Sequence, residues 1–509
     1  MSNKPRTSLI LISLALLVNG CVAVGPEYEK PTVDTELAWL EAQQQGISEQ
    51  PATDPQWWKT AFVDPVLDEL VATALAENLT LRSAGLRILQ AQQNLAIAVG
   101  KQYPQSQVLS GSADFKQISK NSSDHIPLLD HNFTTFGLGF NLNWEADFFG
   151  RFKRMIQTAS AQLDASVAGY DEVMVSMIAG VAQNYLLIRT YQQRLSYARD
   201  NVNVQQESLT ISQARYEGGM VTELDVDQAQ TLLSNTQATV YALETALQQF
   251  KNNLAVLLGQ SPQHMSALLG TAAPVPSVPA QIALGMPQDL IRRRPDIRVA
   301  ERQLAAQSAQ IGFAITELYP SFTLGGNIGT STNNTNGKNI GDMFDSDSLT
   351  GNIFGAFSWN IFNYGRIKSN VRLQDAVFQQ LLVDYRNLVL QAQGEVENAI
   401  VAYLNSQQQL NAYRVAAVAA QRAVGVAQVQ YEDGLITYDR VIQTLLALEG
   451  QQDLLASTEG AVATNLVQVY KTLGGGWEIR SSADASDLLP TATKDQMRTR
   501  IKYWDGMLD

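Results

Sequence analysis

The sequence predicts a mainly α-helical protein that also carries two β-hairpins, built from one structural unit that occurs twice. Three observations lead to this prediction. The first is an internal repeat that spans most of the chain. The second is a pair of apolar stripes at helical period that continue for dozens of residues, and the third is a pair of segments in which apolar and polar residues alternate.

The N-terminus has the layout of an export signal. Lys4 and Arg6 precede an almost unbroken apolar run at 9–18, which is too short to span a bilayer because a helix needs about 20 apolar residues to do so. A glycine and Cys21, the single cysteine of the chain, follow. This order resembles a bacterial lipoprotein signal, so we expect removal of residues 1–20 and lipidation of Cys21.

Composition excludes several classes of protein. The net charge of −13 becomes −15 once the two basic residues of the leader are removed, and so acidic a chain repels nucleic acid. No run of 18 apolar residues follows the leader, so a membrane crossing would require a closed barrel. Val22, rather than aspartate, follows Cys21, which favours sorting to the outer membrane.

Motifs for catalysis or metal binding are missing from the sequence. The three histidines, at His125, His131 and His264, form no metal-binding pattern, and there is no glycine-rich phosphate loop or cysteine pair. We therefore expect no cofactor, no metal and no enzymatic activity.

The repeat divides the chain into two copies, at 76–260 and 291–475, joined by a proline-rich connector at 261–290. The offset between matching residues is 216 positions in the first two groups and 215 in the others. This period far exceeds the roughly 20–50 residues of solenoid units, so each copy should be a whole subdomain. The matching groups are 78–82 with 294–298, 103–104 with 319–320, Trp144 and 149–151 with Trp359 and 364–366, 216–219 with 431–434, and 258–259 with 473–474.

Each copy begins with a helix and a hairpin. In the first copy, a helix over 81–102 ends before Pro104, and apolar residues alternate with polar ones over 136–145. The hairpins should therefore lie at about 105–145 and about 320–362, each with a polar loop between its strands.

Two long helices follow the hairpins, at 151–216 and 366–431, because no proline interrupts 128–261 or 321–489. Each would be about 100 Å long at about 1.5 Å per residue, so it must lie beside other helices. Glycines then turn the chain into return helices at 224–258 and 438–473.

The four strands of one chain cannot close a membrane barrel, since the smallest have about eight. Two chains would give a filled eight-stranded barrel, three would give twelve strands with a lumen, and a soluble open sheet is the alternative. The alternating faces fit all of these.

Several motifs, taken together and in order, carry a family resemblance. They are CVAVGPEYEKP at 21–31, Trp57-Trp58 with Phe62, Asp64-Pro65 and Leu67, MPQDLIRRRPDIRVAE at 286–301, FNYGR at 362–366, and the two Tyr…Gly turns. The set resembles the outer membrane factors of the TolC/OprM kind, in their NodT-like lipoprotein branch.

This resemblance implies a homotrimer with a twelve-stranded β-barrel in outer membrane lipid and an α-helical periplasmic tunnel. Residues 21–75 and 476–509 would be equatorial segments. The implied partners are a periplasmic adaptor and an inner-membrane transporter, commonly of the RND class. The implied function is that of a passive exit duct for toxic small molecules.

The resemblance also places the adaptor-docking tips at the two helix turns. Ordinary turn chemistry, with glycine ending one helix and threonine starting the next, explains the same residues. The tip residues are Gly218, Gly219, Met220, Val221 and Thr222, and Gly434, Leu435, Ile436 and Thr437.

A periplasmic gate would lie just past the turns. Threefold symmetry turns each acid into a ring of three, which selects cations, while links between Asp439 and Arg440 could hold the mouth shut. The alternative is a set of acids favoured by helix N-termini, above all Glu223 and Asp225. The gate residues are Tyr438, Asp439, Arg440, Gln443, Asp225 and Asp227, with Gln443 standing where some relatives have an acid.

Other interpretations stay open from sequence. The basic run 292–294 is expected to be a solvated helix entrance rather than a phosphate site. A duct for copper or silver, a channel for protein or peptide secretion served by an ABC transporter, and a lipid-anchored scaffold without a pore are the rival functions.

Overall fold

The computed structural model of the chain describes residues 23–33, 38–41, 44, 47–48, 54–121, 131–264, 269, 271–279, 281–285, 287–289, 293–335, 337–480 and 484–508. The leader and Cys21, and with them the predicted lipidation site, lie outside the described residues. The α-helices are α2 Trp57–Phe62, α3 Pro65–Glu77, α4 Leu79–Gly100, α5 Arg151–Glu217, α6 Glu223–Leu257, α9 Pro295–Thr316, α10 Arg366–Glu432, α11 Tyr438–Thr472, α12 Ala485–Leu488 and α13 Thr491–Arg500. The strands are β1 Ile47–Ser48, β2 Ser106–Gln117, β3 Asn132–Ala146, β4 Ile282–Ala283, β5 Ser321–Asn333 and β6 Leu349–Ser358.

Corresponding helices of the two copies have equal lengths. The long helices α5 and α10 have 67 residues each, and the return helices α6 and α11 have 35 each. Their ends lie within a residue or two of the positions expected from the apolar stripes and the glycine turns.

One helix among the described residues, α5, contains a window apolar enough to cross a membrane by length and composition. Its window has a mean hydropathy of 1.2, and 67% of that window is buried inside the structure. A buried apolar window is typical of a core helix, so α5 is part of the helical core.

The compact units do not coincide with the sequence repeats. One unit comprises residues 1–31, 90–165 and 300–384, and the other comprises 32–89, 166–299 and 385–509. Each unit therefore contains pieces of both copies. The expectation that each copy forms its own subdomain is wrong, because strands and helices of one copy pair with those of the other.

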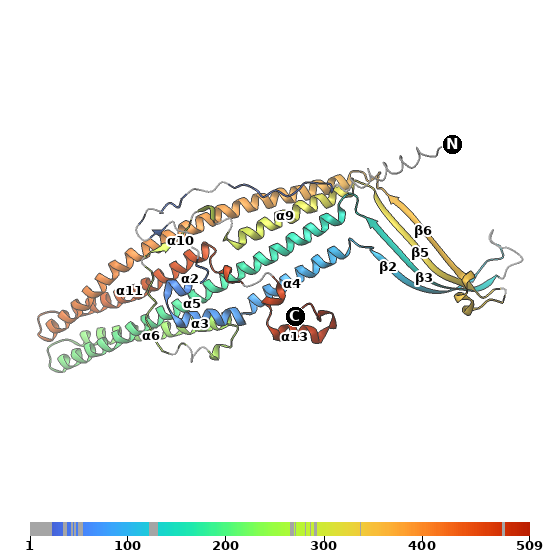
Figure 1. Cartoon of the computed structure of the whole chain (residues 1–509). Helices are drawn as coiled ribbons and strands as arrows, with labels where there is room; N and C mark the ends of the chain where they lie inside the picture. The colour runs from blue at the N-terminus through green and yellow to red at the C-terminus, as the bar shows by residue number, and fades with distance from the viewer. Residues whose placement is uncertain are drawn as a thin grey trace. The chain divides into compact units, whose positions relative to one another are not determined.

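The four long strands form one antiparallel sheet in the order β2-β3-β5-β6 (Figure 1). The two hairpins are joined through β3 and β5, where Phe140 lies opposite Ile328 and Trp144 opposite Leu324. Since residues opposite each other share a face, this register gathers the apolar residues of all four strands on one face. That face carries Leu109, Phe115, Phe136, Leu138, Phe140, Leu142, Trp144, Phe322, Leu324, Ile328, Leu349, Ile353 and Phe357.

The opposite face of the sheet is mostly serine, threonine, asparagine and glycine, with Val108, Phe133 and Phe354 as apolar exceptions. The apolar face is solvent-exposed in the single chain: Leu109 is 70% exposed, Ile353 is 88% exposed and Phe357 is 71% exposed. Nothing in the described chain pairs with the outer edges of β2 and β6. The sheet is thus open at both edges and uncovered on its apolar face.

In each copy, a side chain next to the first helix bonds the C-terminal end of the return helix. In the first copy, Asn78 Nδ2 donates to the carbonyl of Leu257 at 2.7 Å, at the end of α6. In the second copy, Arg294, which matches Asn78, donates from Nη1 to the carbonyl of Thr472 at 3.2 Å, at the end of α11. Both side chains satisfy a helix C-terminus that would otherwise lack partners.

Arg294 is only 8% exposed, so this arginine of the basic run is not part of the solvated entrance expected from sequence. Its guanidinium also pairs with Asp296 and Glu395, each at 2.7 Å. Arg293 bonds Glu478 at 3.2 Å, and its carbonyl accepts the indole N–H of Trp477 at 2.8 Å. The described part of the run, Arg293 and Arg294, is a packing element that fastens the C-terminal segment.

The Trp57-Trp58 motif is also structural. Both indoles are buried, and Trp57 stacks on Tyr470 with centroids 4.9 Å apart. Asp64 caps α3 by accepting the amide N–H groups of Val66 and Leu67. Its second oxygen accepts the hydroxyl of Tyr185 at 2.5 Å, and burial followed by this bond raises the pKa of Tyr185 to about 12.

A fully buried carboxylate ties α5 to two other segments. Asp171 is 0% exposed and receives Arg480 Nε at 2.6 Å and Arg298 Nη1 at 3.0 Å. Arg298 also lies over the ring of Trp477 at 4.5 Å. Burial raises the pKa of Asp171, and the two arginines act against that rise.

We predict that Asp171→Ala lowers the free energy of unfolding by about 3–5 kcal/mol, because it leaves two largely buried guanidinium groups without their shared partner. Denaturant unfolding of the purified protein, followed by circular dichroism, measures the change. The control is Glu244→Ala, which removes an exposed pair with Arg199 and should cost at most about 1 kcal/mol. Equal effects of the two changes would contradict the prediction.

Candidate functional site

The two helix turns lie beside each other and are built alike (Figure 1). At the first turn, Gly219 has φ +68° and Met220 N–H donates to the carbonyl of Arg215 at 2.9 Å. At the second turn, Gly434 has φ +73° and Leu435 N–H donates to the carbonyl of Gln430 at 2.8 Å. These are the bonds of a Schellman helix end, which requires the left-handed conformation that glycine adopts freely.

Thr222 and Thr437 occupy the N-cap positions of α6 and α11, with extended backbones. Neither side chain makes a capping hydrogen bond, so the capping role expected for the threonine hydroxyls is absent at both turns. The two hydroxyls are exposed and free to take other partners at the surface.

An apolar core lies directly under the turns and takes residues from all four helices. Val221 and Ile436, at matching turn positions, pack against it. The buried members are Leu209, Ala229, Leu232, Leu233, Val424, Tyr431, Tyr438, Val441, Leu445 and Leu448. The helical hairpin α5–α6 and the helical hairpin α10–α11 therefore form one packed unit at this end.

Tyr438 belongs to this core and is only 1% exposed. Its hydroxyl lies 3.1 Å from the hydroxyl of Ser208, and its ring lies 5.2 Å from that of Tyr431. Burial raises the pKa of Tyr438. Within a single chain its side chain packs between helices instead of lining a surface.

Arg215 connects the two hairpins through a contact that the sequence does not signal. Its Nη1 donates to the carbonyls of Tyr431, at 2.5 Å, and Glu432, at 2.8 Å, which are the last residues of α10. Its guanidinium also lies 4.7 Å from the centre of the Tyr431 ring. A cation at a helix C-terminus satisfies free carbonyls and opposes the negative end of the helix dipole.

The charged residues beyond the turns divide into two groups. Asp225 is half-buried, and its carboxylate accepts the hydroxyl of Tyr431 at 3.5 Å, whereas Asp227 is exposed. On α11, Gln443 Nε2 donates to Asp439 at 2.8 Å, and its Oε1 accepts Arg440 Nη1 at 3.3 Å. Gln443 thus bridges an acid and a base on one exposed helix face.

The tip itself presents apolar side chains to solvent. Met220 is 64% exposed and Leu435 is 72% exposed, and the two occupy matching positions in the repeat. Gly218, Gly219 and Gly434 are exposed with them. Two large apolar side chains are therefore exposed at matching positions of the two turns.

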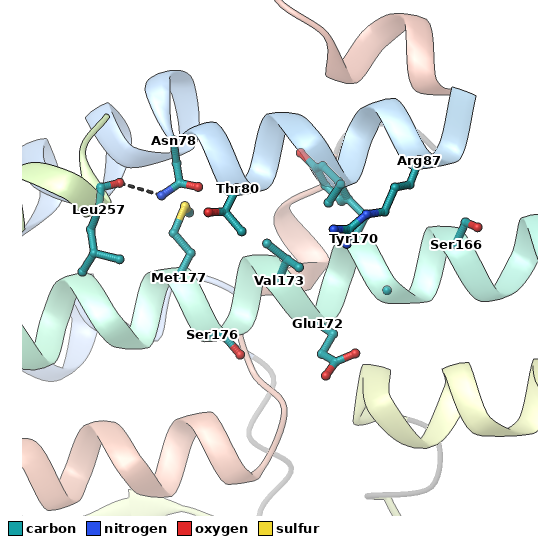
Figure 2. A pocket seen from close by; sticks show the side chains of 12 residues that line it. Asn78, Thr80, Arg87, Ser166, Tyr170, Glu172, Val173, Ser176, Met177 and Leu257 are labelled. Carbon is teal, nitrogen blue, oxygen red and sulfur yellow. Dashed lines mark hydrogen bonds between the residues drawn. The ribbon is translucent and has the colours of Figure 1, made fainter. Parts of the chain in front are cut away.

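A separate pocket of about 500 Å³ lies between α4 and α5 (Figure 2). Arg87 comes from α4, while Glu172 and Met177 come from α5, and Asn78 bonds Leu257 at its end. Burial, and then Asp296, raise the pKa of Glu172.

We predict that Arg215→Gln, which copies the matching residue Gln430, loosens the second turn. Hydrogen bonds to a charged group contribute about 1.5–3 kcal/mol, so amide exchange at Gly434 and Leu435 should accelerate about 10- to 100-fold. Hydrogen exchange with mass spectrometry measures this change. The control is Arg199→Gln, at an exposed residue of the same helix. Equal acceleration in both variants would contradict the role of Arg215 in holding the end of α10.

Comparison with known proteins identifies the family. The family model described as outer membrane efflux protein matches residues 70–260 and 286–475, which are the two copies of the repeat. Nodulation protein T of Rhizobium leguminosarum bv. trifolii is 30% identical over 451 residues, covering 88% of this chain and 91% of that protein.

Other comparisons agree. The pyoverdine export outer membrane protein OpmQ of Pseudomonas putida is 30% identical over 434 residues, covering 85% of this chain and 90% of that protein. The structure of the outer-membrane channel OprN has a TM-score of 0.82 and 29% identity, covering 89% of this chain and 99% of that chain. The resemblance read from the motifs is confirmed: the chain belongs to the outer membrane efflux protein family, whose members are outer membrane channels.

Proposed function

We propose that three copies of this chain form the exit duct of a tripartite efflux pump. Each chain contributes four strands to a twelve-stranded barrel in the outer membrane, and the long helices of the three chains form a periplasmic tunnel. A periplasmic adaptor and an inner-membrane transporter of the RND class deliver the cargo. The duct is passive and needs no cofactor, because the transporter supplies the driving force.

The observation that carries this proposal is the unfinished sheet. Its apolar face is exposed, and its edge strands β2 and β6 keep unpaired backbone groups. In hydrocarbon, each unpaired backbone group costs several kcal/mol, so a sheet in a membrane must close on itself. Closure with the apolar face outward and the polar face inward gives a lipid-facing wall around a wet lumen.

The internal repeat supports a specific register for the closure. Within the chain, Leu142 of β3 lies opposite Gly326 of β5. The register of β2 with β3 is the same as that of β5 with β6 when 215 is added to each residue number. By this offset, Leu142 of β3 corresponds to Phe357 of β6, and Gly111 of β2 corresponds to Gly326 of β5. If β6 of one chain pairs with β2 of the neighbouring chain as β3 pairs with β5, Phe357 lies opposite Gly111 of the neighbour and the apolar faces are aligned.

The N-terminal segment supports lipid anchorage at Cys21. Arg154, which is 1% exposed, donates to the carbonyls of Val24 at 3.0 Å and Gly25 at 3.1 Å. Val24 N–H donates to the carbonyl of Phe149 at 3.0 Å, just before α5. This clamp holds the chain close behind Cys21 beside the end of β3, where a barrel would meet the membrane surface.

The paired turns support docking and gating. The exposed side chains of Met220 and Leu435 offer the adaptor an apolar contact, repeated around the trimer. Asp225, Asp227, Asp439, Arg440 and Gln443 would line the gate, with Tyr438 packed behind them. The Asp439–Gln443–Arg440 cluster is exposed in one chain and available to a neighbouring copy.

The relatives suggest the cargo class. OpmQ is named for export of pyoverdine, and TtgF of Pseudomonas putida is named for toluene efflux. Small toxic compounds are the proposed substrates, with selection made by the transporter.

We predict that the pair Gly111→Cys and Phe357→Cys crosslinks neighbouring copies into covalent trimers in membranes. A side chain at Gly111 fits, since its Cβ would find no atom nearer than 3.8 Å. Mild oxidation and non-reducing gel electrophoresis read the result.

Each single variant is the control and should stop at dimers or monomers. Monomers alone from the double variant, in protein inserted in the outer membrane, would overturn the barrel.

We predict that Asp439→Ala raises the leak of the closed channel several-fold in planar bilayers, because it removes the acceptor of Gln443 and a charge from the proposed gate. The matched control is Asp433→Ala, an exposed acid in the turn just before α11. An unchanged closed state in Asp439→Ala would remove this cluster from the gate, and a bilayer without any conductance would favour a scaffold over a duct.

A further inference from the structure

The passages from sheet to long helix are built alike in the two copies. Trp144 Nε1 donates to the carbonyl of Gln102 at 3.2 Å, and the matching Trp359 Nε1 donates to the carbonyl of Leu318 at 2.9 Å. A glycine with positive φ begins each long helix, with Gly150 at +80° and Gly365 at +83°. We call these two passages the first and the second joint.

The first joint is closed by a contact between the copies of the repeat. Phe149 stacks on Tyr319, with ring centroids 4.6 Å apart and an interplanar angle of 26°. Phe149 follows β3, whereas Tyr319 precedes β5, the strand paired with β3. The contact is therefore a consequence of the neighbouring strands.

The second joint is bare. Tyr364, the counterpart of Phe149, is fully exposed at 105%, and Tyr103, the counterpart of Tyr319, is 63% exposed. Tyr364 follows β6 and Tyr103 precedes β2, so the two rings flank the open edges of the sheet. Neither has a ring partner among the described residues.

We propose that Tyr364 of one subunit stacks on Tyr103 of the neighbouring subunit and closes the second joint between the two chains. This inference rests on the proposed trimer and adds a named contact to it. In the trimer, β6 of one subunit pairs with β2 of the neighbouring subunit in the way that β3 pairs with β5 within the chain. The same geometry then brings the second pair of rings together.

The surroundings of both tyrosines suit burial against another copy. Arg151 lies over Phe313 at 5.5 Å in the first joint, and the counterpart of Phe313 is Ile97, which is 58% exposed. Near Tyr364, Phe362 is 87% exposed and Leu373 is 58% exposed. Exposed apolar side chains therefore occur in the chain near both tyrosines, and a second chain could cover them.

The backbone of Tyr364 differs from that of its counterpart. Its φ of +50° is left-handed, which is unfavourable for a bulky side chain, whereas Phe149 has no positive φ. Seating on the next copy would let Tyr364 adopt the backbone conformation of Phe149.

The test is the double variant Tyr103→Cys with Tyr364→Cys, treated in membranes with a short bifunctional maleimide. The pair Phe149→Cys with Tyr319→Cys calibrates the reagent, since it must crosslink within one chain without forming oligomers. We expect covalent trimers from the tyrosine pair and none from either single variant.

The strand pair Gly111→Cys with Phe357→Cys separates the two ideas. Trimers from the strand pair without trimers from the tyrosine pair would overturn the stack and leave the barrel intact. Failure of both pairs would overturn the barrel.

A second measurement uses the temperature at which detergent-resistant trimers dissociate on gels. Tyr364→Ala should lower it, while Tyr364→Phe, which keeps the ring, should leave it unchanged. Tyr241→Ala, at a residue 70% exposed on α6, is the control for losing an exposed aromatic ring. An unchanged dissociation temperature in Tyr364→Ala would overturn the stack.

Discussion

A β-strand carries backbone donors and acceptors on both sides, and in this chain β2 and β6 each leave one side unused. The apolar face between these edges is exposed as well. Water would tolerate the edges but not so large an apolar face, whereas lipid would tolerate the face but not the edges. The proposed closure with further chains satisfies both conditions. The two 67-residue helices, which are too long for a compact domain, would gain neighbours from the same assembly.

The duplication gives one chain two β-hairpins of similar register, which pair through β3 and β5. The two copies solve the same local problem with different chemistry at the end of the return helix. Asn78 reaches one carbonyl through a short amide, whereas Arg294 reaches Thr472 and also pairs with Glu395 and Asp296. A longer side chain at the second position joins more segments, and the C-terminal segment is fastened there through Trp477.

Sequence reasoning located the helices, the strands and the turns because their signals are local. A long stretch without proline, an apolar stripe and a left-handed glycine each act within a few residues. It missed contacts that join distant positions. No pattern marks Arg215 as the partner of carbonyls at Tyr431 and Glu432, and none distinguishes the buried Asp171 from the other acids of α5. The mixing of the copies in the compact unit that contains the sheet follows from the pairing of β3 with β5, which no local pattern specifies.

Two differences between the copies beside the turns make the two helical hairpins unequal. The position of Arg215 in the first copy is Gln430 in the second, and the position of Glu223 is the buried Tyr438. The first hairpin therefore supplies the cation that holds the end of α10, and the second supplies the ring on which that cation rests. If α11 moves to open a mouth, the shared core and this one clamp are what it must move against, because they join the second hairpin to the first.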